Sequence, residues 1–248
     1  MRTLSWFSCG AASAIATKIA FNEVDNVEAV YCDPGSEHPD NERFMMDCEE
    51  WFGVNIIRLK SDEYNNVDEV IEAKKYLSGI AGAPCTGELK RLPRHKYQRH
   101  DDLHVFGYTS EETRRANSFK NNNPELNLWF PLIEKGINKN DCLAILGDKG
   151  IELPAMYKLG YEHNNCLGCV KSGGVVYWDK IRRHFPEVFK MRCQQSRKYG
   201  AKLLIIWNPE KGENERFFLD ELPQEIDAKD DVGEHVCDFL CQSISNEL

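Results

Sequence analysis

The chain has 248 residues, which is room for one domain or for one domain with a small appendage. Hydrophobic residues make up 42% of it, but no run approaches the roughly 18 apolar residues needed to cross a bilayer, which excludes a membrane-spanning protein. The formal net charge of −9 argues against a general nucleic-acid binder, which would need a local basic groove or a partner protein.

Strand-like and helix-like segments alternate through the first half of the chain. Strands are expected at residues 3–7, 27–31, 54–59, 103–107 and 126–130, and helices at 11–23, 41–52, 66–77, 86–100 and 111–120. This alternation predicts an α/β fold with a doubly wound, mainly parallel five-stranded sheet over residues 1–135. With the first strand in the centre, the loop that follows it lies at the carboxyl edge, where open α/β sheets bind ligands.

The second half, residues 136–248, is predicted to be a mainly helical part that packs on the first and carries a Cys-x-x-Cys sequence. Helices are expected at 138–146, 179–184 and 186–199, a strand at 203–207, a solvated acidic loop at 220–234 and a last helix ending at 248.

Ten cysteines are many for a chain whose first residues show no signal-peptide core. A cytoplasmic protein is therefore expected, and stable disulfides are not. The cysteines are therefore more readily interpreted as metal-binding or reactive residues, above all the pair Cys166 and Cys169.

The loop after the first strand reads Ser8-Cys9-Gly10-Ala11-Ala12-Ser13. Small residues between a strand and a helix let a phosphate approach backbone N–H groups, and the helix dipole favours the anion. The alternative is that these residues are small only because the start of the helix packs closely on the sheet.

This loop resembles the Ser-Gly-Gly-x-Asp-Ser pyrophosphate loop of the adenine nucleotide α-hydrolase superfamily. Ser8, Gly10 and Ser13 fit that motif, while Cys9 and Ala12 depart from it. Asp33, Gly35 and Pro39 match the Asp-Thr-Gly-x-x-Phe-Pro-Glu-Thr segment of phosphoadenylylsulfate (PAPS) reductases. Segments 83–93, 106–119, 129–146 and 159–169 also resemble that family, in the right order. The chain is therefore similar to PAPS reductase-like proteins over roughly residues 3 to 175.

The resemblance implies that the loop of residues 8–13 holds the β and γ phosphates of ATP or a related adenine nucleotide, PAPS included. Asp33, followed by Gly35, would lie beside the adenosine, or would instead cap the turn at Gly35. Gly107 would leave space for the nucleotide. Arg114 and Arg115 would bind phosphate, with a solvated helix face as the alternative.

The resemblance also places basic residues after Cys85. Lys90, Arg91 and Arg94 would meet an anionic substrate, and a solvated basic face is the alternative. Ala12 removes the carboxylate that the family motif carries, so the placement of Mg²⁺ and the cleavage of ATP are both open.

Cys85, Cys166 and Cys169 would supply three thiolates to a [4Fe–4S] cluster and leave one iron open for a sulfur ligand. Zinc is the alternative, with His163 as the fourth ligand, and a redox-active Cys166–Cys169 pair is the third interpretation.

The resemblance implies an enzyme that cleaves ATP between the α and β phosphates, adenylates an unknown acceptor and transfers sulfur to it. A PAPS or adenylylsulfate reductase is the alternative, although the chain lacks the Glu-Cys-Gly-Leu-His segment of thioredoxin-dependent reductases. A nucleotide-binding module without catalysis is the third hypothesis. A homo-oligomer is compatible with the sequence.

Overall fold

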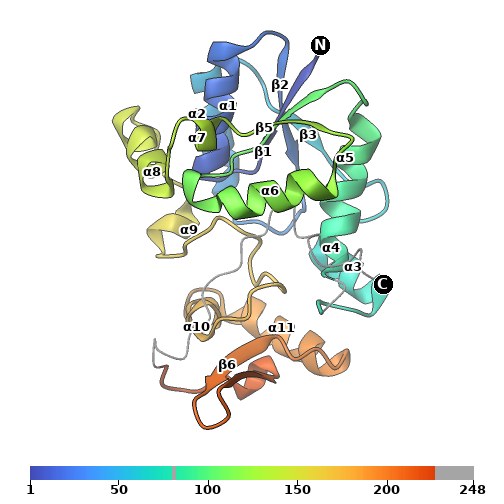
Figure 1. Ribbon diagram of the computed structural model, residues 1–248. Coiled ribbons are helices and arrows are strands. Elements are labelled where there is room, and N and C mark those ends of the chain that lie inside the picture. Colours follow the sequence, from blue (N-terminus) through green and yellow to red (C-terminus); the bar gives the residue numbers. More distant parts are fainter. Residues whose placement is uncertain (80–81, 227–248) are drawn as a thin grey trace.

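The computed structural model describes residues 1–79 and 82–226 of the chain. Its centre is a five-stranded parallel sheet with the strand order β3-β2-β1-β4-β5 (Figure 1). The strands are β1 (Thr3–Phe7), β2 (Val27–Cys32), β3 (Ile57–Leu59), β4 (Leu103–Val105) and β5 (Asn127–Trp129). The predicted α/β fold with a doubly wound parallel sheet is confirmed, and β1 is its central strand.

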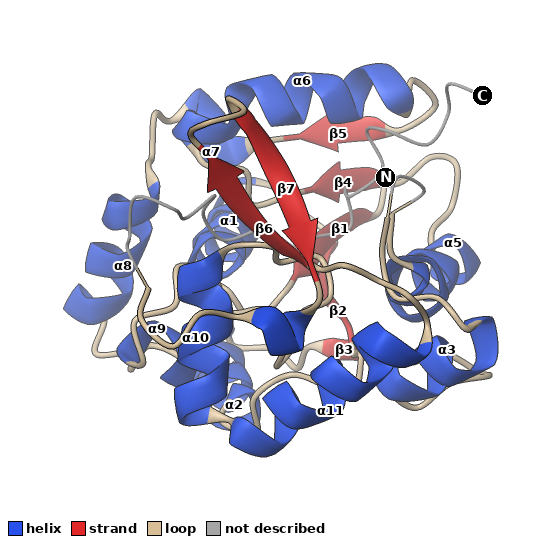
Figure 2. Ribbon diagram, turned by 90° about the horizontal axis from the view of Figure 1, so that it is seen from below, coloured by secondary structure: helices blue, strands red, loops and turns tan. Residues whose placement is uncertain are grey.

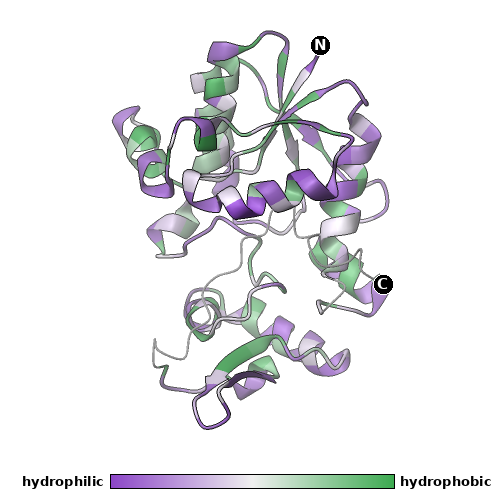
Figure 3. Ribbon diagram, viewed as in Figure 1, coloured by the Kyte–Doolittle hydropathy of each residue, from purple (hydrophilic) through white to green (hydrophobic). Residues whose placement is uncertain are grey.

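Helices cover both faces of this sheet. The helices of the first 148 residues are α1 (Ala11–Glu23), α2 (Asn41–Phe52), α3 (Val67–Lys74), α4 (Pro84–Thr86), the π-helix η1 (Gly87–Arg91), α5 (Leu92–Tyr97), the 3₁₀-helix η2 (Ser110–Glu112), α6 (Thr113–Asn122), α7 (Pro131–Glu134) and α8 (Lys139–Asp148). Helices α1, α2, α7 and α8 lie on one side, and α5 and α6 on the other (Figure 2). Helix α6 is largely hydrophilic, and its Ala116 and Phe119 are the residues that it buries (Figure 3).

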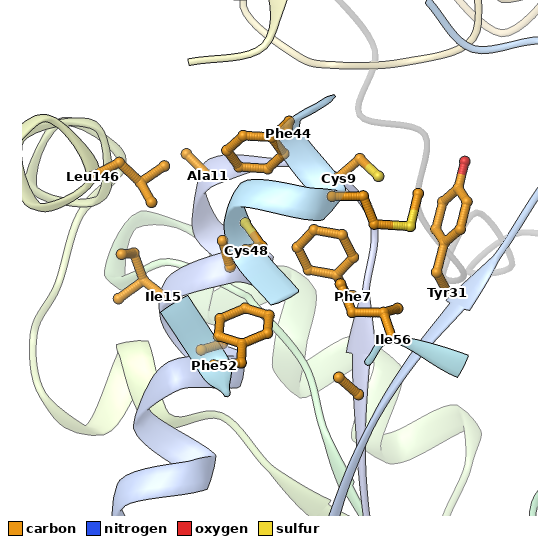
Figure 4. Close-up of a cluster of buried hydrophobic side chains, with 14 of the residues drawn as sticks. Phe7, Cys9, Ala11, Ile15, Tyr31, Phe44, Cys48, Phe52, Ile56 and Leu146 are labelled. Atoms are coloured by element: carbon orange, nitrogen blue, oxygen red, sulfur yellow. The ribbon is translucent and has the colours of Figure 1, made fainter. Parts of the chain in front are cut away.

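The alternation of side chains along β1 divides the core into two layers. All five residues of β1 are buried, as expected for a central strand of a parallel sheet. Leu4 and Trp6 join the layer under α5 and α6, whereas Phe7 joins the layer under α1 and α2. Figure 4 shows this second layer, in which Phe7 stacks on Phe44 with ring centroids 6.2 Å apart.

The C-terminal part contains α9 (Ala155–Lys158), α10 (Val175–His184), α11 (Pro186–Lys198), an antiparallel hairpin of β6 (Leu204–Asn208) and β7 (Glu213–Phe217), and the 3₁₀-helix η3 (Leu219–Glu221). Its hydrophobic core includes Val70 and Ile71 of α3, while α8 packs on α1. The expected strand at 203–207 corresponds to β6, but its partner β7 was not expected. The expected last helix lies outside the described residues.

Among the described residues, no helix combines the length and the apolar character that crossing a membrane requires.

Candidate functional site

A cavity of about 290 Å³ opens at the carboxyl ends of β1 and β4, the point at which the strand order reverses. Such switch points are where open α/β sheets bind ligands. The cavity is lined by Trp6, Ser8, Gly10, Ala11, Ala12, Ser13, Lys90, Phe106, Gly107, Tyr108, Thr109, Glu111, Glu112, Lys139, Tyr157, Glu162, His163, Asn164 and Asn165. Five of the six residues of the predicted phosphate loop are therefore on its wall.

Hydroxyl groups hold this loop closed on itself. The Oγ of Ser13 accepts hydrogen bonds from the backbone N–H and the Oγ of Ser8, at 3.0 and 3.1 Å, and donates to the carbonyl of Gly10. Helix α1 begins there without a side-chain cap, and the N–H of Ala11 donates to the phenol oxygen of Tyr157 at 3.3 Å. The start of α1 thus presents amides and a positive dipole end to the cavity, which is the usual chemistry of an anion site.

Cys9 is the one loop residue that is not on the cavity wall. Its backbone has a φ of 55°, the left-handed conformation that glycine favours, and its side chain packs in the core beside Phe7 and Phe44 (Figure 4). Burial raises the pKa of the Cys9 thiol well above its ordinary value. Cys9 therefore takes the turn expected of the motif's glycine while its thiol acts as a buried hydrophobic group.

Gly107 follows β4 and packs directly on the start of α1. A Cβ at this position would lie 2.7 Å from the backbone nitrogen and the Cα of Ser13. The close approach that requires glycine is therefore between two backbone segments of the cavity wall. The space that Gly107 leaves for a nucleotide stays a prediction.

Asp33 and Gly35 form a turn after β2 and are not among the residues that line the cavity. The carboxylate of Asp33 accepts a hydrogen bond from the N–H of Gly35 at 2.8 Å, and Lys60 lies 3.3 Å from it. Gly35 has a φ of 62°, and a Cβ there would lie 1.9 Å from the carbonyl oxygen of Asn65. This is the turn-capping alternative for Asp33, and the contact with adenosine stays a prediction.

The basic residues on the cavity wall are Lys90, Lys139 and His163. Arg115 pairs with Glu112 at 2.6 Å and lies over the ring of Tyr108, and Arg114 is exposed. Neither arginine is among the residues that line the cavity. Their predicted contacts with phosphate remain untested.

The three basic residues after Cys85 have different surroundings. Lys90 lies on the π-helical turn η1, a kind of turn that is frequent at functional sites. Arg94 is a buried residue of α5, and burial lowers its pKa to about 10. Arg91 is half-buried, and neither arginine is on the cavity wall.

A buried carboxylate faces Lys90. The Nζ of Lys90 lies 3.5 Å from Glu37, and both side chains are less than a tenth exposed. The other oxygen of Glu37 accepts hydrogen bonds from Tyr31 at 2.8 Å and Asn41 at 2.7 Å. Burial raises the pKa of Glu37, and these three partners oppose the rise.

A second, smaller cavity of about 10 Å³ adjoins Lys90. It is lined by Pro34, Val67, Cys85, Thr86, Lys90, Cys166, Gly168, Cys169, Val170 and Arg192. The structure therefore brings together the three cysteines that were predicted as metal ligands, although they come from segments about eighty positions apart. Its walls are otherwise largely apolar, and Cys166 and Cys169 are almost fully buried.

We call this second cavity the thiol cavity. The chemistry of its side chains suits a metal cluster, but its size does not. Thiolates are the usual ligands of iron–sulfur clusters, and three of them would leave one iron of a [4Fe–4S] cluster open. Within residues 1–79 and 82–226, however, no three His, Cys, Asp or Glu side chains are grouped closely enough to hold a metal ion. The cavity has room for about one water molecule, so a cluster requires its walls to part. His163 lines the larger cavity instead of this one.

Several site residues were not predicted from the sequence: Tyr157, Lys139, Asn164 and Glu37. The amide of Asn164 donates to the carbonyl of Cys9 at 2.7 Å and to Asn41 at 2.8 Å. Asn164 lies two positions before Cys166, and this proximity was the one signal available in the sequence. Nothing local distinguishes Tyr157 or Glu37.

The family of the chain follows from its match to known protein families. Residues 2–175 match the model of the phosphoadenosine phosphosulfate reductase domain. The chain belongs to this family. The family is part of the superfamily of adenine nucleotide α-hydrolases with a pyrophosphate loop, and its members bind adenine nucleotides. The matched range contains the three cysteines of the smaller cavity and both lysines, Lys90 and Lys139.

A solved structure similar to this chain is that of phosphoadenylyl-sulfate (PAPS) reductase from Candida auris in a phosphate complex. The identity is 11% and the TM-score 0.45, and the match covers 67% of this chain and 82% of the other. No curated protein sequence matches the chain.

Proposed function

We propose that the protein is an enzyme of sulfur chemistry that binds an adenine nucleotide in the larger cavity, with its phosphates on the loop of residues 8–13. The observation that carries this proposal is the position of Lys90, which lines both the larger cavity and the thiol cavity. A nucleotide and a sulfur-bearing group would therefore meet at one ammonium group.

The larger cavity offers each part of a nucleotide a suitable surface. The amides at the start of α1 and the ammonium groups of Lys90 and Lys139 offset phosphate charge. The aromatic side chains of Trp6, Phe106 and Tyr108 supply an apolar wall for the adenine base. The loop itself has no carboxylate, so this assignment does not depend on a metal ion held by residue 12.

In the reaction that we favour, ATP activates an acceptor. An acceptor oxygen attacks the α-phosphorus, the bond to the bridging oxygen breaks, and pyrophosphate leaves. A sulfur nucleophile then attacks the activated carbon, the carbon–oxygen bond breaks, and AMP leaves. The contribution of the chain is to position the reactants and to stabilise the charge on pyrophosphate, for which Lys90 is the main candidate.

Cys85, Cys166 and Cys169 are the residues that would hold an iron–sulfur cluster. A cluster held by three thiolates would supply an iron that can carry a sulfur ligand. Without a cluster, the three thiols would still line the same small cavity as Lys90, with Cys166 and Cys169 buried and Cys85 half-buried.

Product analysis tests the proposal. Protein prepared without oxygen is incubated with radiolabelled ATP, with water in place of the unknown acceptor, and release of AMP and pyrophosphate is followed with and without sulfide. Nucleotide-dependent release that is lost in Lys90→Met supports it. Tight binding of ATP without any turnover would instead identify a nucleotide-binding module.

A reductase is the second candidate, and the match to the PAPS reductase domain over residues 2–175 is the observation that favours it. In that reaction a thiolate attacks the sulfur of PAPS, adenosine 3′,5′-bisphosphate leaves, and a second thiol then releases sulfite as the two sulfurs form a disulfide. Sulfite produced from PAPS in the presence of a dithiol, with no pyrophosphate from ATP, would establish this function.

A further inference from the structure

The side chain of Glu37 is only 5% exposed, and the proposed reaction does not use its carboxylate. It stands in a polar chain that connects Lys90, on the walls of both cavities, with Asn164, on the wall of the larger one. Its Oε1 faces the Nζ of Lys90 at 3.5 Å, and its Oε2 accepts from Tyr31 and from Asn41. Asn41 in turn accepts from Asn164, whose amide also holds the carbonyl of Cys9.

Two hydrogen-bond donors besides Lys90 hold Glu37 in place. Tyr31 lies on β2 and Asn41 on α2, two elements of the central core, and both donate to the same oxygen of Glu37. Lys90 has a flexible four-carbon side chain, and it lines both cavities. An anion that enters the larger cavity therefore meets an ammonium that already has a carboxylate beside it.

We propose that Glu37 is a positioning residue that serves as an internal counter-ion for Lys90: it holds the ammonium at the boundary of the two cavities while they are empty, and a bound anion competes with it. This inference rests on the proposed binding of an adenine nucleotide. It adds a residue that sets the affinity of that site without touching the ligand.

The physical reason is the cost of burying a charge. An ammonium that is less than a tenth exposed needs a nearby negative charge, and Glu37 supplies one in the empty protein. Stability is thereby gained at the expense of anion affinity, because the two negative groups share one cation. Removal of the carboxylate should shift both quantities, in opposite directions.

The test is a thermodynamic cycle on the full chain. Wild type, Glu37→Gln, Lys90→Met and the double variant are titrated with ATP and, in parallel, with PAPS, and their melting temperatures are measured without ligand. Glu37→Gln should melt lower than wild type and bind one of these nucleotides about fivefold more tightly or better, the lower end of typical coupling between linked groups. In the Lys90→Met background the same change should leave the affinity unaltered.

Asp102→Asn is the matched control. Asp102 is also a buried carboxylate paired with a cation, Arg2 at 2.6 Å, but it lies at the amino end of β4, away from the cavities. This variant should lose stability and keep the wild-type affinity. If Glu37→Gln does not fold, Glu37→Asp, which keeps the charge but withdraws it from Lys90, should show a smaller gain.

Two results overturn different parts of the account. Wild-type protein that binds neither nucleotide contradicts the proposed function and the inference with it. Wild-type binding together with unchanged or weaker affinity in the Glu37 variants, or a gain that persists in the Lys90→Met background, overturns the inference alone.

Discussion

The side-chain amide of Asn164 donates a 2.7 Å hydrogen bond to the backbone carbonyl of Cys9. This contact joins the loop before the Cys-x-x-Cys sequence to the tip of the predicted phosphate loop. It holds Cys9 in a left-handed conformation that a residue with a side chain adopts only at a cost. The conformation of the predicted phosphate loop therefore depends on the loop that precedes Cys166.

Asn164→Ala should loosen this connection. The carbonyl of Cys9 and the Oδ1 of Asn41 would lose a buried donor, which typically costs about 1–3 kcal/mol. Urea unfolding should report this loss, and titration with ATP should show weaker binding. Asn123→Ala is the control, since its amide bonds the carbonyl of Phe119 near the end of α6, and it should leave ATP binding unchanged. Equal ATP affinity in wild type and Asn164→Ala would contradict the role of Asn164.

Gly107→Ala should destabilise the protein by about 1–3 kcal/mol, because the new methyl group overlaps the backbone of Ser13. Gly147→Ala provides the contrast: Gly147 lies in α8, a Cβ there meets nothing within 4 Å, and the change should stabilise the protein by up to about 1 kcal/mol. Denaturant melts of the two variants decide the matter. Unchanged stability of Gly107→Ala would contradict the prediction, because it would mean that the start of α1 shifts to make room for the methyl group.

The sequence predicts an element correctly where the local pattern of apolar and small residues matches the burial of that element in the fold. The segments Thr3–Phe7 and Ala11–Glu23 were predicted residue for residue, because a buried apolar run is followed by small residues and then a regular helix. β7 was missed because Glu213–Phe217 is mostly polar and becomes a strand by pairing with β6.

The candidate site was only partly readable. The loop, Lys90 and the three cysteines lie on the cavities, and their order in the family motifs revealed them. The contacts of Glu37 with Lys90 and of Tyr157 with Ala11 form only in the folded chain, since each pair is distant in the sequence. No local pattern could have distinguished them.

The three cysteines of the thiol cavity should act together if they hold a cluster. Each of Cys85→Ser, Cys166→Ser and Cys169→Ser should lower the iron and sulfide content of protein purified without oxygen, together with broad absorbance near roughly 400 nm. Cys193→Ser is the control, because Cys193 is half-buried on α11 and does not line the cavity. Colourless wild-type protein with one zinc would contradict the cluster.

Acid should weaken the fold through His104. Burial, assisted by the nearby charge of Arg94, lowers its pKa to about 4. From about pH 6.5, the ordinary value for histidine, down to about 4, the unfolded chain binds a proton that the folded chain does not, so stability falls as the pH falls. The loss should approach about 3 kcal/mol, and it should be smaller in His104→Asn. Urea unfolding between pH 4 and 7 measures it, and identical pH dependence in the two proteins would refute the assignment.

Calorimetric titration with ATP is the most direct test of the central claim, that an adenine nucleotide occupies the cavity over the loop of residues 8–13. Lys139 begins α8 on the cavity wall, whereas Lys149 follows the same helix and is exposed. We predict that wild type and Lys149→Met bind one ATP with equal affinity, and that Lys139→Met binds about tenfold more weakly, the usual cost of losing a charged hydrogen bond. Absence of binding to the wild type, or equal affinity in all three proteins, would contradict the account.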